Sequence, residues 1–306
     1  YMLRNTSDKS RIFHLALYSL LGAFLAGAIL ALLGLAYGGD TANLGYLRIS
    51  IFLQDILVIF LPAYLVFYYS FEQSWKSLGF VKSNNLPKLL LYALLIFIVS
   101  MPSISVLARW NELISFPPSL SKLEVMFRDM EDSALAVTDR FLAGKSWWEL
   151  LLNLGLIAVL AGFVEEVFFR GALQKLIHRW FSNGHVAVWS AAFIFSLIHL
   201  QFYGFFPRVL MGAILGYLYL YSGNIWVPIF AHFANNASVV LNNYFLSDTE
   251  IYDKMENLEL NWAAWFVMLI SLYFTAVLLR KMKQQSISEP KHVIVEKQSY
   301  IKTDIK

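Results

Sequence analysis

Residues 150–177 read LLLNLGLIAVLAGFVEEVFFRGALQKLI, a stretch long and apolar enough to cross a lipid bilayer that nevertheless contains Glu165, Glu166 and Arg170. Each charge at the centre of an isolated membrane helix costs roughly 2.5 to 3.5 kcal/mol on insertion scales. Charged residues at such positions face the interior of a helix bundle or a water-filled cavity. The stretch therefore predicts a membrane helix that carries a buried polar site.

The composition of the whole chain is typical of a membrane protein. Of its 306 residues, 58% are hydrophobic and only 15% are charged, and the mean hydropathy is +0.57. The net charge of +3 gives no sign of a nucleic-acid-binding surface, so no nucleic-acid partner is expected. The sequence contains no cysteine, which excludes disulfides, thiolate zinc sites and a cysteine nucleophile.

Apolar runs predict an all-α bundle of about eight transmembrane helices. The runs cover residues 12–37, 49–71, 89–108, 150–177, 186–200, 209–221, 226–245 and 262–279. Basic residues gather in one alternating set of loops, at 4–11, 76–88, 175–179 and 280–283, and acidic residues in the other, at 112–139 and 248–259. Since cytoplasmic loops are enriched in Lys and Arg, the pattern predicts that both termini lie in the cytoplasm.

Four regions are predicted along the chain. Residues 1–145 hold accessory helices and an outer loop, residues 146–246 form the core with the polar positions, residues 247–283 hold an acidic loop and the last helix, and residues 284–306 form a polar cytoplasmic tail. In the outer loop, apolar residues recur at helical spacing between Pro117 and Leu142. This stretch predicts an amphipathic helix that lies on the outer membrane surface or packs on the bundle.

Helix geometry separates the charges of the 150–177 run. Glu166 and Arg170 are four residues apart with the acid first, the favoured order for an ion pair on one helix face. Glu165 points about 100° away from Glu166 and has no cation on its own face, so a water molecule or a metal ion is the expected partner. Such a carboxylate can serve as a general base. The alternative is a purely structural Glu–Arg pair that pins two helices together.

Two further runs contribute complementary polar groups. His199 follows Phe195 by four residues, and His232 and Asn236 lie four apart on one helix face. One pocket that unites these polar insertions explains them better than separate partners for each. Glu165, His199 and His232 form a feasible set of ligands for zinc with a position left open for water. A metal-free site, in which Glu165 polarises water and the other groups orient it or donate to an oxyanion, is equally compatible with the sequence.

Together, EEVFFR at 165–170, FSLIH at 195–199 and HFANN at 232–236 resemble the CPBP family of intramembrane proteases, whose pattern is EExxxR, FxxxH and HxxxN. That family includes the type 2 CAAX prenyl endopeptidase and bacterial Abi proteins linked to bacteriocin processing or immunity. The resemblance extends from Trp147 to about Leu246. It implies an all-helical fold with a polar cavity between helices, a catalytic core at 146–246, and hydrolysis of a peptide bond near the membrane by an activated water.

The resemblance also implies roles for the acidic motif. Glu165 would be the general base, and Glu166 with Arg170 would organise the fourth helix. The expected partners are the lipid bilayer and a membrane-associated peptide or protein substrate, in the cytoplasmic membrane of a bacterium.

The histidine motifs would complete this catalytic set. His199 would hold the water or a metal ion, while His232 and Asn236 would steady the developing oxyanion. A divalent metal, zinc, is the expected cofactor, with Glu165, His199 and His232 as its ligands. Two other interpretations stay open, a catalytically silent scaffold or bacteriocin-immunity factor of the same fold and, less favoured, a proton-coupled transporter, for which an inverted repeat with broken helices is not apparent.

Three subsidiary predictions concern packing. His232 is only about 12 Å along its helix from Asn224, against about 21 Å from Glu165 to the cytoplasmic Arg179, so the connection at 221–224 is expected to dip into the bilayer. Gly212 and Gly216 are expected to let their helix approach a neighbour closely. Asp55 is expected to be a hydrogen-bonding group between helices.

Overall fold

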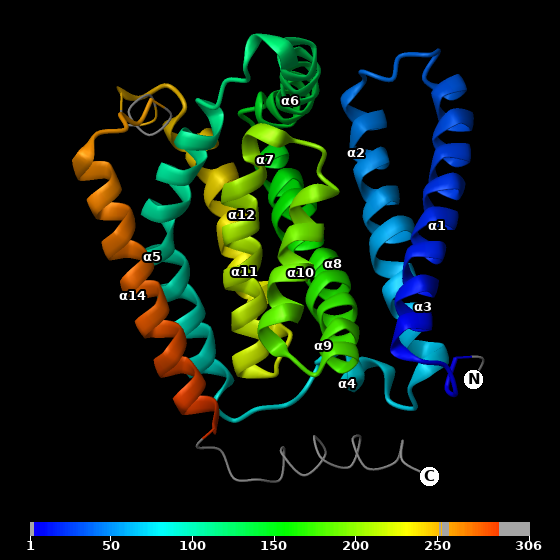
Figure 1. The fold of residues 1–306 in the computed structure, drawn as a ribbon. Helices are drawn as coiled ribbons and strands as arrows, with labels where there is room; N and C mark the ends of the chain where they lie inside the picture. Colours follow the sequence, from blue (N-terminus) through cyan, green and yellow to red (C-terminus); the bar gives the residue numbers. More distant parts are fainter. Residues whose placement is uncertain (1–2, 251, 253–256, 288–306) are drawn as a thin grey trace.

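The predicted all-α, multi-pass architecture is confirmed by the computed structural model of the chain, which describes residues 3–250, 252 and 257–287 (Figure 1). Every regular element in these residues is a helix. Six of the helices are long and apolar enough to cross a membrane, and the chain is an integral, multi-pass membrane protein. The predicted tail at 284–306 lies outside the described residues from 288 onward.

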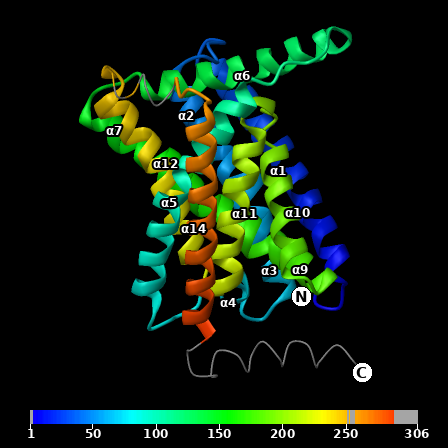
Figure 2. The ribbon, with the colours of Figure 1, turned by 60° about the vertical axis from the view of Figure 1, so that its left-hand side comes forward.

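The first half of the bundle leads up to a helix that crosses one of its ends. Its elements are α1 (Asp8–Ala36), α2 (Leu44–Leu53), the π-helical η1 (Gln54–Phe60), α3 (Leu61–Ser70), α4 (Ser74–Leu78), α5 (Leu86–Glu112), the 3₁₀ turn η2 (Pro118–Leu120) and α6 (Ser121–Leu142). The amphipathic helix predicted between Pro117 and Leu142 is thus present as α6. It runs across the bundle instead of along it (Figure 2).

The second half contains the long helix that carries the acidic motif. That helix is continuous through α7 (Trp147–Asn153), η3 (Leu154–Leu160), α8 (Ala161–Glu166), η4 (Val167–Gln174) and α9 (Lys175–Phe181), with η3 and η4 wound as π-helix. It is followed by α10 (Gly184–Leu197), η5 (Phe202–Gly204), α11 (Phe205–Ser222), α12 (Trp226–Leu246) and α14 (Trp262–Ile287). We call residues 147–181 the site helix.

Each of the eight expected spans has a counterpart in the bundle. Two of them, α10 and α12, are not among the six long apolar helices. The helix α10 has only 14 residues, and α12 is made more polar by His232, Asn235 and Asn236. The start of α1 and the end of α14 lie at one end of the molecule, which we call the basic end, and α6 covers the other (Figure 1).

Local signals set the starts and ends of the helices around the site. The side chain of Ser146 accepts a hydrogen bond from the backbone N–H of Glu149 and so caps the site helix, while Asn183 caps α10 in the same way. Gly223, with φ of +65°, ends α11 in the left-handed conformation that glycine adopts without steric cost. The resulting short connections keep α10, α11 and α12 antiparallel neighbours.

The site helix lies in the middle of the bundle, in contact with η1, α10, α11 and α12. Glycines allow the closest approaches. A Cβ on Gly162 would lie 3.2 Å from the backbone nitrogen of Phe233 in α12, and one on Gly212 would lie 3.1 Å from the Cα of Ala192 in α10. The close packing predicted at Gly212 and Gly216 is therefore present, and it brings α11 against both α10 and η4.

The connection between α11 and α12 is buried beneath residues 78–81. The N–H of Ile225 donates to the carbonyl of Gly79 at 3.0 Å, and the side chain of Asn224, which is 1% exposed, donates to the carbonyl of Val81 at 2.9 Å. A Cβ on Gly171 would lie 3.7 Å from Ile225 Cδ1, so α12 begins beside η4 and not beside the end of α9. This inward start brings His232, early in α12, level with the acidic motif.

Candidate active site

A closed ionic cluster forms where α8, η4 and α12 meet. Glu166 Oε1 accepts hydrogen bonds from Arg170 Nη1 at 2.6 Å and from His232 Nδ1 at 2.8 Å. The exposed fractions of the three residues are 0%, 1% and 2% respectively. Arg170 Nη2 also donates to the carbonyl of Gly212 at 3.1 Å. The predicted Glu166–Arg170 pair is therefore present, and it fastens the site helix to α11 and α12.

The hydrogen bond to Glu166 settles how His232 presents its second nitrogen. An ionised carboxylate only accepts hydrogen bonds, so Nδ1 carries the proton. Nε2 then faces Glu165, whose Oε2 is 3.7 Å away. That distance is too long for a direct hydrogen bond but suits a bridging water. Glu165 is 20% exposed, whereas its neighbour Glu166 is fully buried.

Asn236 joins α12 to the first π-helical segment of the site helix. Its amide nitrogen donates to the carbonyl of Ile157, within η3, at 2.8 Å, and its amide oxygen accepts from Asn235 Nδ2 at 3.0 Å. The wider winding of a π-helix shifts its hydrogen-bond ladder, and such segments are frequent at functional sites. Asn236 thus has a packing role in this arrangement, and its predicted role toward an oxyanion stays a prediction.

His199 packs against an aromatic ring, that of Phe195, which also contacts the cluster. It belongs to the turn after α10, beyond the predicted position at the end of that helix, and its Nδ1 is 2.7 Å from the carbonyl of Phe195. The ring of Phe195 has its centroid 4.9 Å from that of His199 and 6.1 Å from that of His232. It also lies 4.9 Å from the Arg170 guanidinium. Phe195 therefore connects the two histidines by packing.

The donors expected for zinc are only partly brought together. Glu165 and His232 are adjacent, and a carboxylate behind the other ring nitrogen, as Glu166 provides, is the usual support of a histidine that binds metal. Within residues 3–250, 252 and 257–287, however, no group of three or more His, Cys, Asp or Glu side chains has the geometry to hold a metal ion. Zinc at Glu165, His199 and His232 therefore stays a prediction.

Comparison with known proteins points to the same segment. Residues 147–238 match the model of a protein family described as type II CAAX prenyl endopeptidase Rce1-like. We call these matched residues the Rce1-like domain, a name that records their similarity to that family. Over 85 residues the chain is 32% identical to the uncharacterized protein YpbD of Bacillus subtilis (strain 168), an alignment that covers 26% of this chain and 40% of that relative. No solved structure matches the chain.

The chain spans about 40% of the length of the curated relative that it matches. The Rce1-like domain contains all six residues singled out from the sequence as site residues. It also contains Arg208, a charged residue that is not among these six. Arg208, in the first turn of α11, donates from Nη2 to Gln201 Oε1 at 3.0 Å, while its buried Nη1 has no hydrogen-bond partner among the described residues. It lies close enough to Glu165 and His199 to interact with both electrostatically.

A second such charge comes from outside the Rce1-like domain. Asp55, in η1, is 8% exposed, and its carboxyl Oδ2 has no hydrogen-bond partner in the part of the chain that the structure describes. It interacts electrostatically with Glu165 across the contact between η1 and α8. The sequence signal, an acid inside an apolar run, was visible, but the neighbour was not, because η1 and α8 are far apart in the chain.

Proposed function

We propose that this protein is an intramembrane endopeptidase that hydrolyses a peptide bond with a water activated by Glu165. One observation carries the proposal: a partly exposed carboxylate faces the free nitrogen of His232, which a buried Glu166–Arg170 pair holds in place. This arrangement lies within an Rce1-like domain of a multi-pass membrane protein.

The chemistry follows from the protonation states of these groups. A water between Glu165 Oε2 and His232 Nε2 loses a proton to Glu165, and the resulting hydroxide forms a bond to the carbonyl carbon of the substrate. The carbonyl oxygen takes up the negative charge. When the C–N bond breaks, Glu165 returns the proton to the leaving amine. Since Glu165 takes up and releases one proton, the site is regenerated.

The remaining polar groups support this step by position. Glu166 keeps the proton of His232 on Nδ1, so that Nε2 accepts from the water and fixes its orientation. His199 Nδ1 donates to the Phe195 carbonyl, so we assign its Nε2, an acceptor, to a donor group of the substrate, and we assign the second amide proton of Asn236 to the oxyanion. A donor aimed at such an oxyanion is worth roughly 10²–10³-fold in rate.

Zinc is a second part of the proposal and has its own test. If Glu165, His199 and His232 bind zinc, metal analysis of the purified protein will find one equivalent, and Glu165→Gln or His199→Ala will lower it. If Glu165 works without metal, a chelator will leave cleavage unchanged. The second result would contradict the zinc proposal and leave the role of Glu165 as general base intact.

The decisive experiment compares peptide termini in membranes from cells that express the wild type, Glu165→Gln or Glu149→Gln. Glu149 lies at the start of the same helix and is the matched control, since it serves only the Ser146 cap. We expect at least one terminus that is present with the wild type and Glu149→Gln and absent with Glu165→Gln. Identical termini in all three, together with a retained biological effect, would favour the scaffold or immunity interpretation instead.

A further inference from the structure

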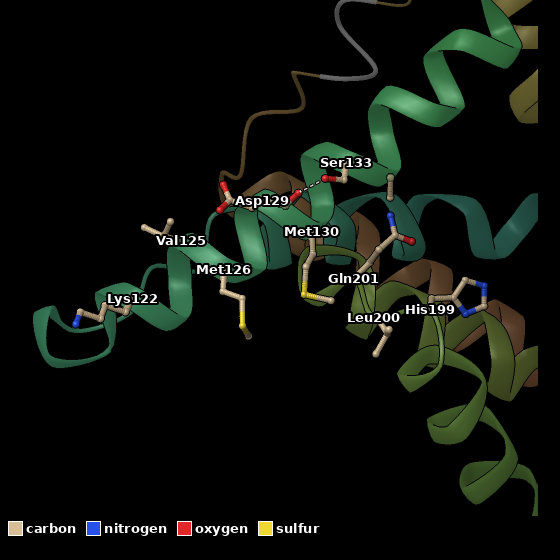
Figure 3. A pocket seen from close by; sticks show the side chains of 10 residues that line it. Lys122, Val125, Met126, Asp129, Met130, Ser133, His199, Leu200 and Gln201 are labelled. Carbon is tan, nitrogen blue, oxygen red and sulfur yellow. Dashed lines mark hydrogen bonds between the residues drawn. The ribbon is translucent and has the colours of Figure 1, made fainter. Parts of the chain in front are cut away.

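A groove lies between α6 and the connection that joins α10 to α11 (Figure 3). Its volume is about 710 Å³, within the range of roughly 300–1,000 Å³ that ligand pockets occupy. One wall comes from α6, where Met126 and Met130 extend from the face turned toward Leu200 (Figure 3). The opposite wall comes from His199, Leu200 and Gln201.

The inner wall of this groove is continuous with the candidate active site. His199 lines the groove and packs on Phe195, which in turn contacts His232 and Arg170. Its neighbour Gln201, also in the lining, accepts a hydrogen bond from Arg208, an electrostatic neighbour of Glu165. A ligand in the groove therefore lies against the side of the site that holds His199.

The site is covered on the side of the basic end. Phe80, which follows α4, and Trp226, at the start of α12, pack on each other there and on Phe163 of the site helix, with ring centroids 5.3 to 6.2 Å apart. Beneath them, the backbone hydrogen bond between Ile225 and Gly79 closes the gap between α12 and the segment after α4. The groove, by contrast, is at the end of the bundle that α6 crosses.

The two ends of the molecule differ in charge in the way that membrane orientation requires. Lys and Arg are concentrated in the loops of the basic end, where α1 begins and α14 ends. The end with α6 carries the acid-rich loop at 112–139 and the described residues 248–250 that follow α12. Basic loops stay in the cytoplasm, so the groove opens on the opposite, extracytoplasmic side.

We propose that the substrate is an apolar peptide segment that enters this groove from the extracytoplasmic side, and not a prenylated C-terminus presented by the cytoplasm. The inference rests on the proposed function and specifies its substrate class. The lining suits such an occupant, because Val125, Met126 and Leu200 are 58%, 47% and 63% exposed and flexible methionine side chains adapt to varied apolar partners. The groove extends the site outward past His199, so a bound segment would pass the histidine before it reaches Glu165.

The absence of cysteine from the sequence makes the direction of access directly measurable. Met126→Cys places a thiol in the groove, and Lys82→Cys places one on an exposed position at the basic end. In intact cells, a membrane-impermeant maleimide will label Met126→Cys, whereas Lys82→Cys will react only after permeabilisation. The reverse pattern, or labelling of Met126→Cys only after permeabilisation, would overturn the proposal.

A second measurement asks whether the groove is used. Labelled Met126→Cys is compared with the same variant unlabelled, and Leu135→Cys, exposed on α6 but outside the groove, is the matched control. We expect labelling to slow the Glu165-dependent cleavage at least tenfold in Met126→Cys and by less than twofold in Leu135→Cys. Val125→Cys repeats the test if Met126→Cys is inactive before labelling. If cleavage depends on Glu165 but is not slowed by labelling, the groove proposal alone is contradicted. If cleavage does not depend on Glu165, the proposed function is contradicted.

Discussion

Glu165 and Glu166 are adjacent in α8, but they differ in burial and in hydrogen bonding. Glu166 faces α11 and α12, is fully buried, and shares one oxygen between Arg170 and His232. Glu165 interacts electrostatically with Asp55 of η1, keeps a fifth of its side-chain surface exposed, and meets His232 only at 3.7 Å. Two identical side chains thus acquire different environments from the helices that surround them, one fully buried and one partly exposed.

The buried cluster of Glu166, Arg170 and His232 explains how His232 is held in position next to the partly exposed Glu165. An ion pair taken out of water is tolerated only with good geometry and further hydrogen bonds, which the Gly212 carbonyl and His232 supply. Held in this way, His232 presents Nε2 to Glu165 at little cost in side-chain freedom. The comparison predicts that the two glutamates respond differently to the same substitution.

The largest expected effect is on catalysis at Glu165. Glu165→Gln removes the proposed general base and should slow cleavage about 10²–10⁴-fold, while the melting temperature of the detergent-solubilised protein stays close to that of the wild type. Glu166→Gln should lower both the rate of cleavage and the melting temperature, because the buried Arg170 loses its counterion. Rates and melting curves of the two variants check this. An equal loss of stability in Glu165→Gln and Glu166→Gln would contradict the predicted difference between the two glutamates.

The next effect is on stability within the closed cluster. Arg170→Ala leaves Glu166 buried without its cation and should lower the free energy of unfolding by about 3–5 kcal/mol. Arg140→Ala, at an exposed position on α6, is the control and should change it by no more than about 0.5 kcal/mol. Chemical denaturation in mixed micelles measures both. A loss of under about 1 kcal/mol for Arg170→Ala would show that the cluster contributes little.

A smaller effect is expected where α11 meets α10 and the cluster. Gly212→Ala puts a Cβ 3.1 Å from the Cα of Ala192, and such overpacking costs typically about 1–3 kcal/mol. Gly27→Ala in α1 is the matched control, since its Cβ would meet no atom within 4 Å. Melting temperatures of the two variants provide the measurement. A Gly212→Ala protein as stable as Gly27→Ala would mean that α11 moves without penalty.

The smallest effect concerns the helix above the groove. Burial raises the pKa of Glu131, against the opposing charges of Arg208 and Arg128, with Asp132 nearby adding to the rise. A carboxyl whose pKa is raised by docking stabilises that docking at pH below its ordinary value and loses the contribution as pH rises through the raised value. Hydrogen exchange of residues 121–142, corrected for intrinsic rates, should therefore be slower near pH 5 than near pH 8.

The variant Glu131→Gln tests that sign. It keeps the acceptor for Gln201, whose Nε2 donates to Glu131 at 3.2 Å, but it removes the titrating group. The exchange of α6 should then become independent of pH over the same interval. An unchanged slope in Glu131→Gln would assign the pH dependence to another residue.

Much of this architecture was accessible without coordinates because a bilayer imposes simple rules. Apolar length and loop charge predicted the helical bundle, the amphipathic α6 and the shared side of the start of α1 and the end of α14. The i,i+4 spacing predicted the Glu166–Arg170 pair. Each of these follows from residues that are neighbours in the chain or from sums over a single segment.

The sequence by itself therefore determined the class of protein, the helix that carries the acidic motif and the pairing of Glu166 with Arg170, because these depend on local periodicity and hydrophobicity. Only the tertiary structure decided that His232 bonds to Glu166, that Phe195 packs against both histidines, and that the groove opens beneath α6. Contacts between helices depend on where α12 begins and on how closely glycines let helices approach, and no spacing within one helix encodes either distance.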